Sequence, residues 1–244
     1  MTAAIVLLAQ LSAGAIVAHA KEVDLQVKDL SANVHMEIVA NGEVKIRVFE
    51  LIMRREGVDY RAVITLLEPE EMEGTRFLIV AQRGKRNRQW AYFPDLDLVR
   101  PIAGRNQDDP FLGSNISYAD LAGGAHLDDL RHRLVGEEEI DGTPCYVMVG
   151  VPRHRIAYGK LRGWVRKDNF VTMKAVFFDQ ELEPLKEARL TDVREVDGIP
   201  MAHRIEMKSL VEDGHTVLSL HELRINQNLP SGLFTAEALD ASEN

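Results

Sequence analysis

The stretch "VHMEIVANGEVKIRVFELIM" (residues 34–53) contains two apolar runs separated by Asn41-Gly42. In each run, apolar side chains recur at every second position over several residues. This period is typical of a strand that turns one face toward a core. Asn-Gly supplies the positive φ angles that a tight hairpin turn needs. The stretch therefore predicts a β-hairpin.

The same turn signal recurs along the rest of the chain. Four more dipeptides stand between or before alternating runs: Asp141-Gly142, Asp168-Asn169, Asp197-Gly198 and Asp213-Gly214. From about residue 33 onward, the pattern predicts about ten to twelve antiparallel strands. A flat sheet of this size would expose its edges and one apolar face, so we expect it to curl or close.

The fold class expected from these patterns is mainly β, with a single antiparallel sheet and a few short helices. The helices are expected at residues 68–74, 117–122 and 235–239. No linker divides the chain. Its 244 residues are 45% hydrophobic, which is enough for one domain of this class.

Charge and cysteine content narrow the function classes. The net charge of −9 argues against general nucleic-acid binding, and the 6% aromatic content argues against base-stacking platforms. The single cysteine, Cys145, excludes an intrachain disulfide. Its context "PCYVMVGV" predicts a buried position in a strand.

The first twenty residues differ from the rest of the chain. They are apolar and rich in small residues, they end in Ala18-His19-Ala20, and charge begins at Lys21. This pattern predicts a signal peptide over residues 1–20, a mature domain over 21–244 and export. A transmembrane anchor or a buried strand is the alternative, although Gln10 and Ser12 interrupt the apolar run.

The stretch "FLGSNISYADL" (residues 111–121) is partly apolar and lies between two strand-rich halves. Ser117 is placed to cap a short helix, and Asp120 falls in its first turn, where a carboxylate is favoured. Tyr118 and Leu121 are three residues apart and so share one helix face. We expect this segment to cover the concave side of the curled sheet, with Tyr118 and Leu121 as lid residues.

Catalytic motifs are not found. The sequence contains no G-x-S-x-G, Gly-rich phosphate loop, C-x-x-C or H-E-x-x-H pattern, so neither an enzyme nor a cofactor is predicted. The stretch "HLDDLRH" could offer a divalent ion four side chains, His126, Asp128, Asp129 and His132. The alternative is a solvated strand face with charged pairs, and we strongly favour it because the sequence offers no second cluster to complete a metal site.

Two basic stretches stand out in this acidic protein. Either one alone is an ordinary polar hairpin, but together they suggest docking to an anionic surface such as lipid head groups. The first, "RGKRNR", is predicted to dock a partner through Arg83, Lys85, Arg86 and Arg88. The second, "PRHRIAYGKLRGWVRK", contains Arg153, Arg155, Lys160, Arg162, Arg166 and Lys167.

Several motifs together resemble the outer-membrane lipoprotein-sorting protein family. Within it the chain is similar to the LolA-like branch often associated with RND-type membrane transporters. The resemblance covers residues 58–235, and its most specific element is Gly113-Ser114, Tyr118 and Asp120-Leu121. The motifs are "GTRFLI" (74–79), "WAYFPDLDLVRPI" (90–102), "FLGSNISYADL" (111–121), "LVGEEEIDGTPCYVM" (134–148), "YGKLRGWVRKDNFVTMKAVFFD" (158–179) and "LPSGLFT" (229–235).

The resemblance implies an unclosed antiparallel β-barrel with helices over an apolar cavity. It also implies a periplasmic carrier that shields the acyl chains of a lipid or lipoprotein, possible association with an RND-type transporter, and transient contact with a membrane surface. The family usually opens with an amphipathic helix. Here "KEVDLQVKDLSA" (21–32) is short and poorly amphipathic, so we expect that part of the lid to be missing or built differently.

Alternate strand positions supply residues for the cavity lining. The predicted lining residues are Met36, Ile38, Ile46, Val48, Ile64, Leu66, Phe77, Ile79, Trp90, Tyr92, Trp164 and Met173. The alternative function is a periplasmic adaptor that docks a transporter or envelope assembly through the basic hairpins and holds no lipid.

Overall fold

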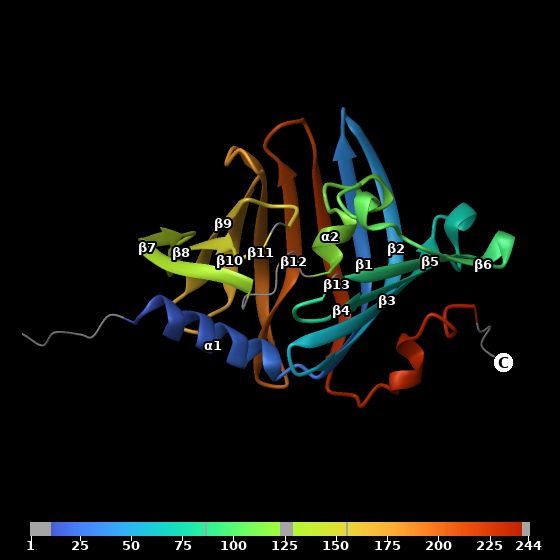
Figure 1. Ribbon diagram of the computed structural model, residues 1–244, viewed down its shortest axis with the longest axis horizontal. Helices are drawn as coiled ribbons and strands as arrows, with labels where there is room; N and C mark the ends of the chain where they lie inside the picture. Colours follow the sequence, from blue (N-terminus) through green and yellow to red (C-terminus); the bar gives the residue numbers. More distant parts are fainter. Residues whose placement is uncertain (1–10, 86, 123–128, 155, 241–244) are drawn as a thin grey trace, which may run out of the picture.

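A computed structural model describes residues 11–85, 87–122, 129–154 and 156–240. Within them, thirteen strands form one antiparallel sheet in the order β6-β5-β4-β3-β2-β1-β13-β12-β11-β10-β9-β8-β7 (Figure 1). Two meanders, β1–β6 and β7–β13, are therefore joined where β1 pairs with β13. The mainly β, single-sheet prediction is confirmed, and one strand more than expected is present.

The strands have the following bounds. They are β1 (Asp29–Ala40), β2 (Glu43–Glu56), β3 (Asp59–Glu68), β4 (Arg76–Ala81), β5 (Arg88–Phe93), β6 (Leu98–Pro101), β7 (Leu130–Ile140), β8 (Thr143–Pro152), β9 (Lys160–Arg166), β10 (Thr172–Phe178), β11 (Pro184–Val196), β12 (Ile199–Ser209) and β13 (His215–Ile225).

The predicted turn dipeptides join consecutive strands. Asn41-Gly42, Asp141-Gly142 and Asp197-Gly198 each have two successive positive φ angles, between 49° and 78°. This is the backbone geometry of the tight hairpin turn that matches the twist of the strands. Asp168-Asn169 lies between β9 and β10, and Asp213-Gly214 precedes β13. All five turns are confirmed.

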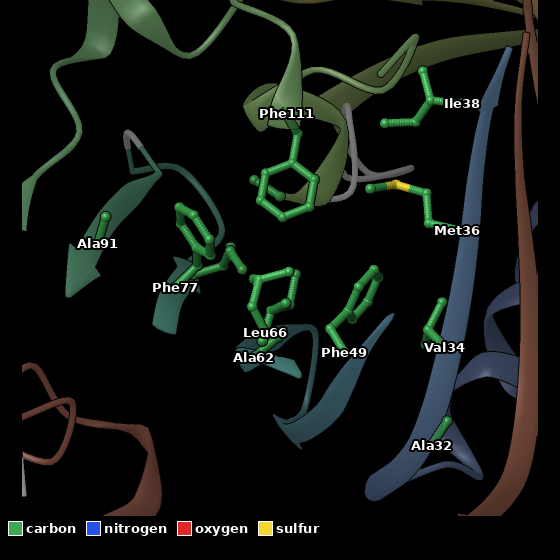
Figure 2. Packing of buried hydrophobic residues seen from close by; sticks show 13 residues of the cluster. Ala32, Val34, Met36, Ile38, Phe49, Ala62, Leu66, Phe77, Ala91 and Phe111 are labelled. Carbon is green, nitrogen blue, oxygen red and sulfur yellow. The ribbon is translucent and has the colours of Figure 1, made fainter. Parts of the chain in front are cut away.

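The sheet is curved, and one face is apolar along β1. We call it the inner face and define it by Ala32, Val34, Met36 and Ile38, which are all buried (Figure 2). Residues paired across strands share a face, so this assignment extends over the whole sheet. The opposite side is the outer face.

One helix covers part of the inner face and was not predicted. Helix α1 (Ala13–Leu25) begins at Ser12, whose Oγ accepts a hydrogen bond from Ala15 N at 3.2 Å. Ile16 is buried against Met148 and Val165, and α1 lies across the β7–β13 half (Figure 1). The helix crosses the predicted cleavage position after Ala20. Most of its apolar positions lie in the stretch assigned to the signal peptide, so residues 21–32 alone contain too little of the pattern.

Two of the three short helices predicted from the sequence are confirmed, and the third is not. The 3-10 helix η1 (Glu70–Met72) and helix α2 (Tyr118–Leu121) lie inside the predicted ranges. The last prediction, 235–239, was wrong, since the 3-10 helix η6 (Ser231–Phe234) precedes that range in the described residues 231–240. Pro230 starts it, and proline favours the position before or at the first helical turn.

The C-terminal segment covers the outer face of the other half. Phe234 and Leu239 are buried against Leu78 and Val80 of β4. Three arginine side chains on the outer face donate hydrogen bonds to the backbone of this segment. Arg54, Arg61 and Arg76 donate to the carbonyl oxygens of Leu229, Phe234 and Leu239 at 2.6, 3.5 and 3.2 Å, respectively.

Two further sequence features can be checked. Cys145 is fully buried on the outer face beside Val147 and Trp164, as predicted. Within the described residues, no helix is long and apolar enough to cross a membrane.

Candidate functional site

Half of the predicted lining residues gather on the inner face of β1, β3 and β4. They form one cluster with Phe49 and Phe111, and their exposed fractions are 0–3% (Figure 2). These six residues are Met36, Ile38, Ile64, Leu66, Phe77 and Ile79.

Ile46 and Val48 lie on the outer face. They pair with Glu37 and His35, whereas Phe49 pairs with Val34 and faces inward. Strand β2 has apolar side chains at both odd and even positions, so its sequence alone does not show which set faces inward. An assignment that is shifted by one residue moves every side chain to the other face of the sheet.

The remaining four predicted residues also lie away from the inner cluster. Trp90 and Tyr92 pack with the C-terminal segment on the outer face. Trp164 and Met173 pack with Cys145, and a register shift between Thr172 and Lys174 displaces Met173 from regular alternation. Alternation alone placed these six side chains on the wrong face or in the wrong cluster. Their positions depend on the pairing register and on the C-terminal segment that crosses the sheet, and both are set by the tertiary structure.

The segment Phe111–Leu121, called the mid-chain segment below, fills the inner face. Figure 2 shows Phe111 reaching toward Phe77 and Leu66, and the Phe77 and Phe111 ring centroids are 5.1 Å apart. Tyr118 stands edge-on to Phe111 at 5.4 Å. On its other side, Ile116 is buried against Ala188 and Met207. The segment thus contacts both halves of the sheet.

Neutral hydrogen bonds fasten the mid-chain segment to three strands. Tyr60 of β3 donates its hydroxyl to the carbonyl oxygen of Leu121 at 2.9 Å. Gln89 of β5 donates Nε2 to the carbonyl oxygen of Tyr118 at 2.7 Å. The backbone N–H of Asn115 donates to Thr216 Oγ1 of β13 at 2.9 Å.

A charged group lies at the centre of this contact. Ser117 is the N-cap of α2 and Asp120 lies in its first turn, as predicted, and Asp120 Oδ2 accepts from the backbone N–H of Ser117 at 2.7 Å in a capping box. The same oxygen accepts from Lys186 Nζ of β11, and Oδ1 accepts from the Tyr158 hydroxyl at 2.5 Å. The side chains of Asp120 and Lys186 are only 8% and 9% exposed.

Aromatic rings enclose the same charged group. Lys186 Nζ lies 5.1 Å from the Tyr158 ring centroid and 5.6 Å from that of Phe177. Burial, together with the neighbouring Asp120 carboxylate, raises the pKa of the Tyr158 hydroxyl far above its usual range. Tyr158 therefore stays a neutral hydrogen-bond donor to Asp120.

Sequence reasoning missed Lys186 and Tyr158. Lys186 lies on the same inward-facing side of β11 as Ala188 and Leu190. A charged residue in a row of apolar positions was therefore the sequence signal that could have identified it. Its partner Asp120 is 66 residues away in sequence. Nothing in the local pattern joins the two.

A pocket of 140 Å³ lies beneath α1, on the inner face of β8–β10. Its walls are mainly apolar, with His132 at one side. Small residues at inward positions leave the space, and a Cβ at Gly163 would meet nothing closer than the carbonyl oxygen of Lys174 at 4.0 Å. The lining residues are Ile16, Val17, Ala20, Leu130, His132, Met148, Gly150, Leu161, Arg162, Gly163, Val165, Thr172 and Ala175.

The first basic stretch forms the turn of the β4–β5 hairpin. Arg83, Lys85 and Arg88 are exposed there, and Gly84 has the positive φ of the turn. Arg86 lies outside the described residues. Arg88 also stacks over Trp90, with its guanidinium 5.6 Å from the ring centroid.

Three residues of the second basic stretch, Arg162, Arg166 and Lys167, pair with carboxylates, and Arg155 lies outside the described residues. Arg162 contacts Glu138 at 2.7 Å and Arg166 contacts Asp168 at 2.5 Å. These pairs fit an ordinary solvated sheet face. In the proposed metal cluster, His126 and Asp128 lie outside the described residues. Among the residues that are described, no group of three or more His, Cys, Asp or Glu side chains could hold a metal ion.

Comparison with known proteins places the chain among related folds. Residues 58–241 match the model of a protein family described as "-like: Uncharacterized protein". No curated protein matches the sequence. A DUF1329 family protein from Desulfovibrio piger has a similar crystal structure, with 26% identity, a TM-score of 0.88 and coverage of 94% of this chain and 100% of that one.

Two other solved structures share the fold. A putative outer membrane lipoprotein-sorting protein domain from Vibrio parahaemolyticus has 23% identity, a TM-score of 0.85 and coverage of 92% of this chain and 97% of that one. A LolA superfamily protein from Nitrosomonas europaea has 20% identity, a TM-score of 0.75 and coverage of 93% of this chain and 98% of that one.

Proposed function

Because this chain belongs to the family whose model matches residues 58–241, and because it shares its fold with a lipoprotein-sorting domain and a LolA superfamily protein, we propose that it is a non-catalytic periplasmic carrier. It would shield the acyl chains of a lipid or lipoprotein during transfer between membranes. The observation that carries this proposal is the apolar pocket on the inner face of β8–β10, whose walls on the sheet side include Met148, Leu161 and Val165.

The energetic requirement on such a carrier is strict. Burial of an acyl chain in a membrane gains about 0.8 kcal/mol per CH₂, so a chain of about fifteen carbons gains on the order of 12 kcal/mol. A carrier must offer a comparable apolar surface, or extraction fails. Met148 and Val165 supply part of it, and methionine adapts well to tails of different shape.

Export and docking belong to the same proposal. The leader over residues 1–20 would direct the domain 21–244 to the periplasm. The basic hairpin around Arg83, Lys85 and Arg88 would give an acidic protein a positive contact point for a membrane or for a partner. An RND-type transporter as that partner is suggested by the sequence resemblance alone.

Filling the pocket tests the carrier proposal. Gly163→Leu places a side chain in the open space above Gly163. Loss of room for two CH₂ groups corresponds to about tenfold weaker binding of a fluorescent fatty acid. Val149→Leu, on the outer face of the neighbouring strand, is the matched control and should bind the probe like the parent. Equal affinities for the parent and Gly163→Leu would overturn the assignment of this pocket.

The adaptor function remains the second candidate, and one observation favours it. The inner cluster around Met36 and Leu66 is closely packed, and the exposed fraction of both side chains is 0%. Mass spectrometry of the gently purified protein separates the two functions. A carrier should retain lipid at a defined stoichiometry, whereas an adaptor should be lipid-free.

A further inference from the structure

We propose that the mid-chain segment imitates an anionic amphiphile, and that Lys186 and Tyr158 form the binding site for the acidic end of the real ligand. This inference rests on the proposed carrier function and names the ligand class: an acyl chain that ends in a carboxylate or phosphate. The apolar end would take the place of Phe111 and Ile116. The acidic end would take the place of the Asp120 carboxylate.

The first step is that the mid-chain segment occupies the surface that a ligand would need. Met36, Leu66 and Ile79 have at most 1% of their surface exposed while Phe111 covers this cluster. Interiors packed to this density leave no room for an added chain. A ligand can reach this part of the inner face only by displacing Phe111 and its neighbours.

The second step is that the segment can be displaced without breaking the sheet. It is not a strand of the sheet, and its only described β contact is an isolated bridge from Pro110 to Ser117 within the segment's own turn. Its helix α2 is capped internally by Ser117 and Asp120. Its apolar contacts and a small number of side-chain hydrogen bonds hold it in place.

The third step concerns the chemistry at its charged end. Asp120 presents two carboxylate oxygens, one to Lys186 Nζ and the other to the Tyr158 hydroxyl. Both donors belong to the scaffold rather than to the segment. A buried cation left without a partner is costly, so displacement requires another anion to replace Asp120. A fatty-acid carboxylate or a lipid phosphate has the required acceptor oxygens.

The fourth step is that the Asp120–Lys186 pair contributes more to discrimination between anionic and neutral ligands than to the stability of the fold. Desolvation offsets much of the attraction in a buried ion pair, and apolar replacements of both partners are often neutral. The Tyr158 and Phe177 rings add to the desolvation around Lys186. A neutral amphiphile would leave Lys186 unpaired, and the site would therefore discriminate against it.

The test compares ligands that differ only in the charge of the head group. Palmitate and methyl palmitate share an acyl chain, and a phosphatidic acid tests the phosphate form. We expect the parent to bind palmitate about tenfold more tightly than methyl palmitate. This ratio corresponds to the net free energy of about one charge-assisted hydrogen bond. A preference for phosphatidic acid over palmitate would identify a lipid head group as the natural anion.

Variants connect that preference to the proposed residues. Asp120→Asn removes the internal competitor, so it should bind palmitate about tenfold more tightly than the parent and speed hydrogen exchange over residues 111–121. Lys186→Met should abolish the preference for the anion. Lys174→Met is the matched control, because Lys174 forms a 2.8 Å ion pair with Glu187 on the outer face, and it should bind like the parent.

Folding is checked separately. The double variant Asp120→Asn/Lys186→Met leaves no unpaired charge, so it should keep the circular dichroism spectrum of the parent and bind both ligands alike. If Lys186→Met in a folded protein keeps the preference for palmitate, the inference is wrong while the carrier function stands. If no variant and no parent protein binds any acyl ligand, the carrier function itself fails.

Discussion

Cys145 illustrates how position sets the chemistry of a single residue in this protein. Its side chain is fully buried beside Trp164, and Sγ donates to the carbonyl oxygen of Thr143 at 3.4 Å. Burial raises the pKa of the Cys145 thiol, which lowers the fraction of reactive thiolate at a given pH. A lone thiol at this position is thereby protected from oxidation and from exchange with other thiols.

At this scale we expect Cys145 to react slowly in the folded protein. Alkylation by iodoacetamide at pH 8 should be slow without denaturant and should accelerate through the same urea range in which the circular dichroism signal is lost. Both requirements for reaction, access and ionisation, are met only after unfolding. Rapid labelling of the native protein would show that the outer face around Trp164 opens locally.

Among the elements, helix α1 has a packing role that conflicts with the predicted leader. Ser12 caps it and Ile16 anchors it, and both belong to the stretch that the sequence assigns to a leader. Its ring contact between His19 and Phe170, with centroids 4.6 Å apart, belongs to the same stretch. Cleavage after Ala20 stays a prediction, and it would leave only Lys21–Leu25 of the helix. So short a segment does not hold helical structure by itself.

Two versions of the chain test the contribution of α1. A protein starting at Lys21 should melt at a lower temperature than one starting at Leu11, since burial of Ile16 is worth about 1.5–3 kcal/mol. It should also bind more of an apolar dye, because Met148 and Val165 lose their cover. Ile16→Ala in the longer chain is the control that isolates this side chain, and equal melting temperatures for all three would contradict the packing role of α1.

N-terminal sequencing of the protein purified from cells shows which version the cell makes. The sequence pattern predicts a mature start at Lys21. A start before Ser12 would contradict that prediction and would leave the pocket beneath α1 closed as described above. A start at Lys21 would mean that export itself uncovers the inner face of β8–β10.

The whole molecule carries a net charge of −9, so an anionic membrane repels it at long range. The β4–β5 hairpin places Arg83, Lys85 and Arg88 on an exposed turn. Steering by such a local patch acts mainly on the rate of association and weakens as salt screens it.

Replacement of Arg83, Lys85, Arg86 and Arg88 by Ser tests the hairpin. The melting temperature should change little, because exposed charges contribute little to folding. Association with anionic vesicles should slow, and the remaining association should depend less on salt. Arg204→Ser on the outer face of β12 is the control for loss of one positive charge elsewhere. Equal association rates for the parent and the quadruple variant would leave an ordinary solvated hairpin.

The sequence by itself determined the features that depend on neighbouring residues. Asn41-Gly42 and Asp197-Gly198 form tight turns because their backbone angles are a local property. The capping box of Ser117 and Asp120 spans three residues, and the signal for it is equally local. Strand alternation correctly indicated a mainly β protein for the same reason.

Only the tertiary structure decided which face of each strand points inward and which distant groups meet. Val48 and Phe49 are both apolar, and only the pairing of β2 with β1 turns Phe49 inward. Asp120 and Lys186 meet because β11 passes beneath the mid-chain segment once the two meanders join at β1 and β13. Local patterns contain no information on such contacts, because they depend on burial of apolar area summed over the whole sheet.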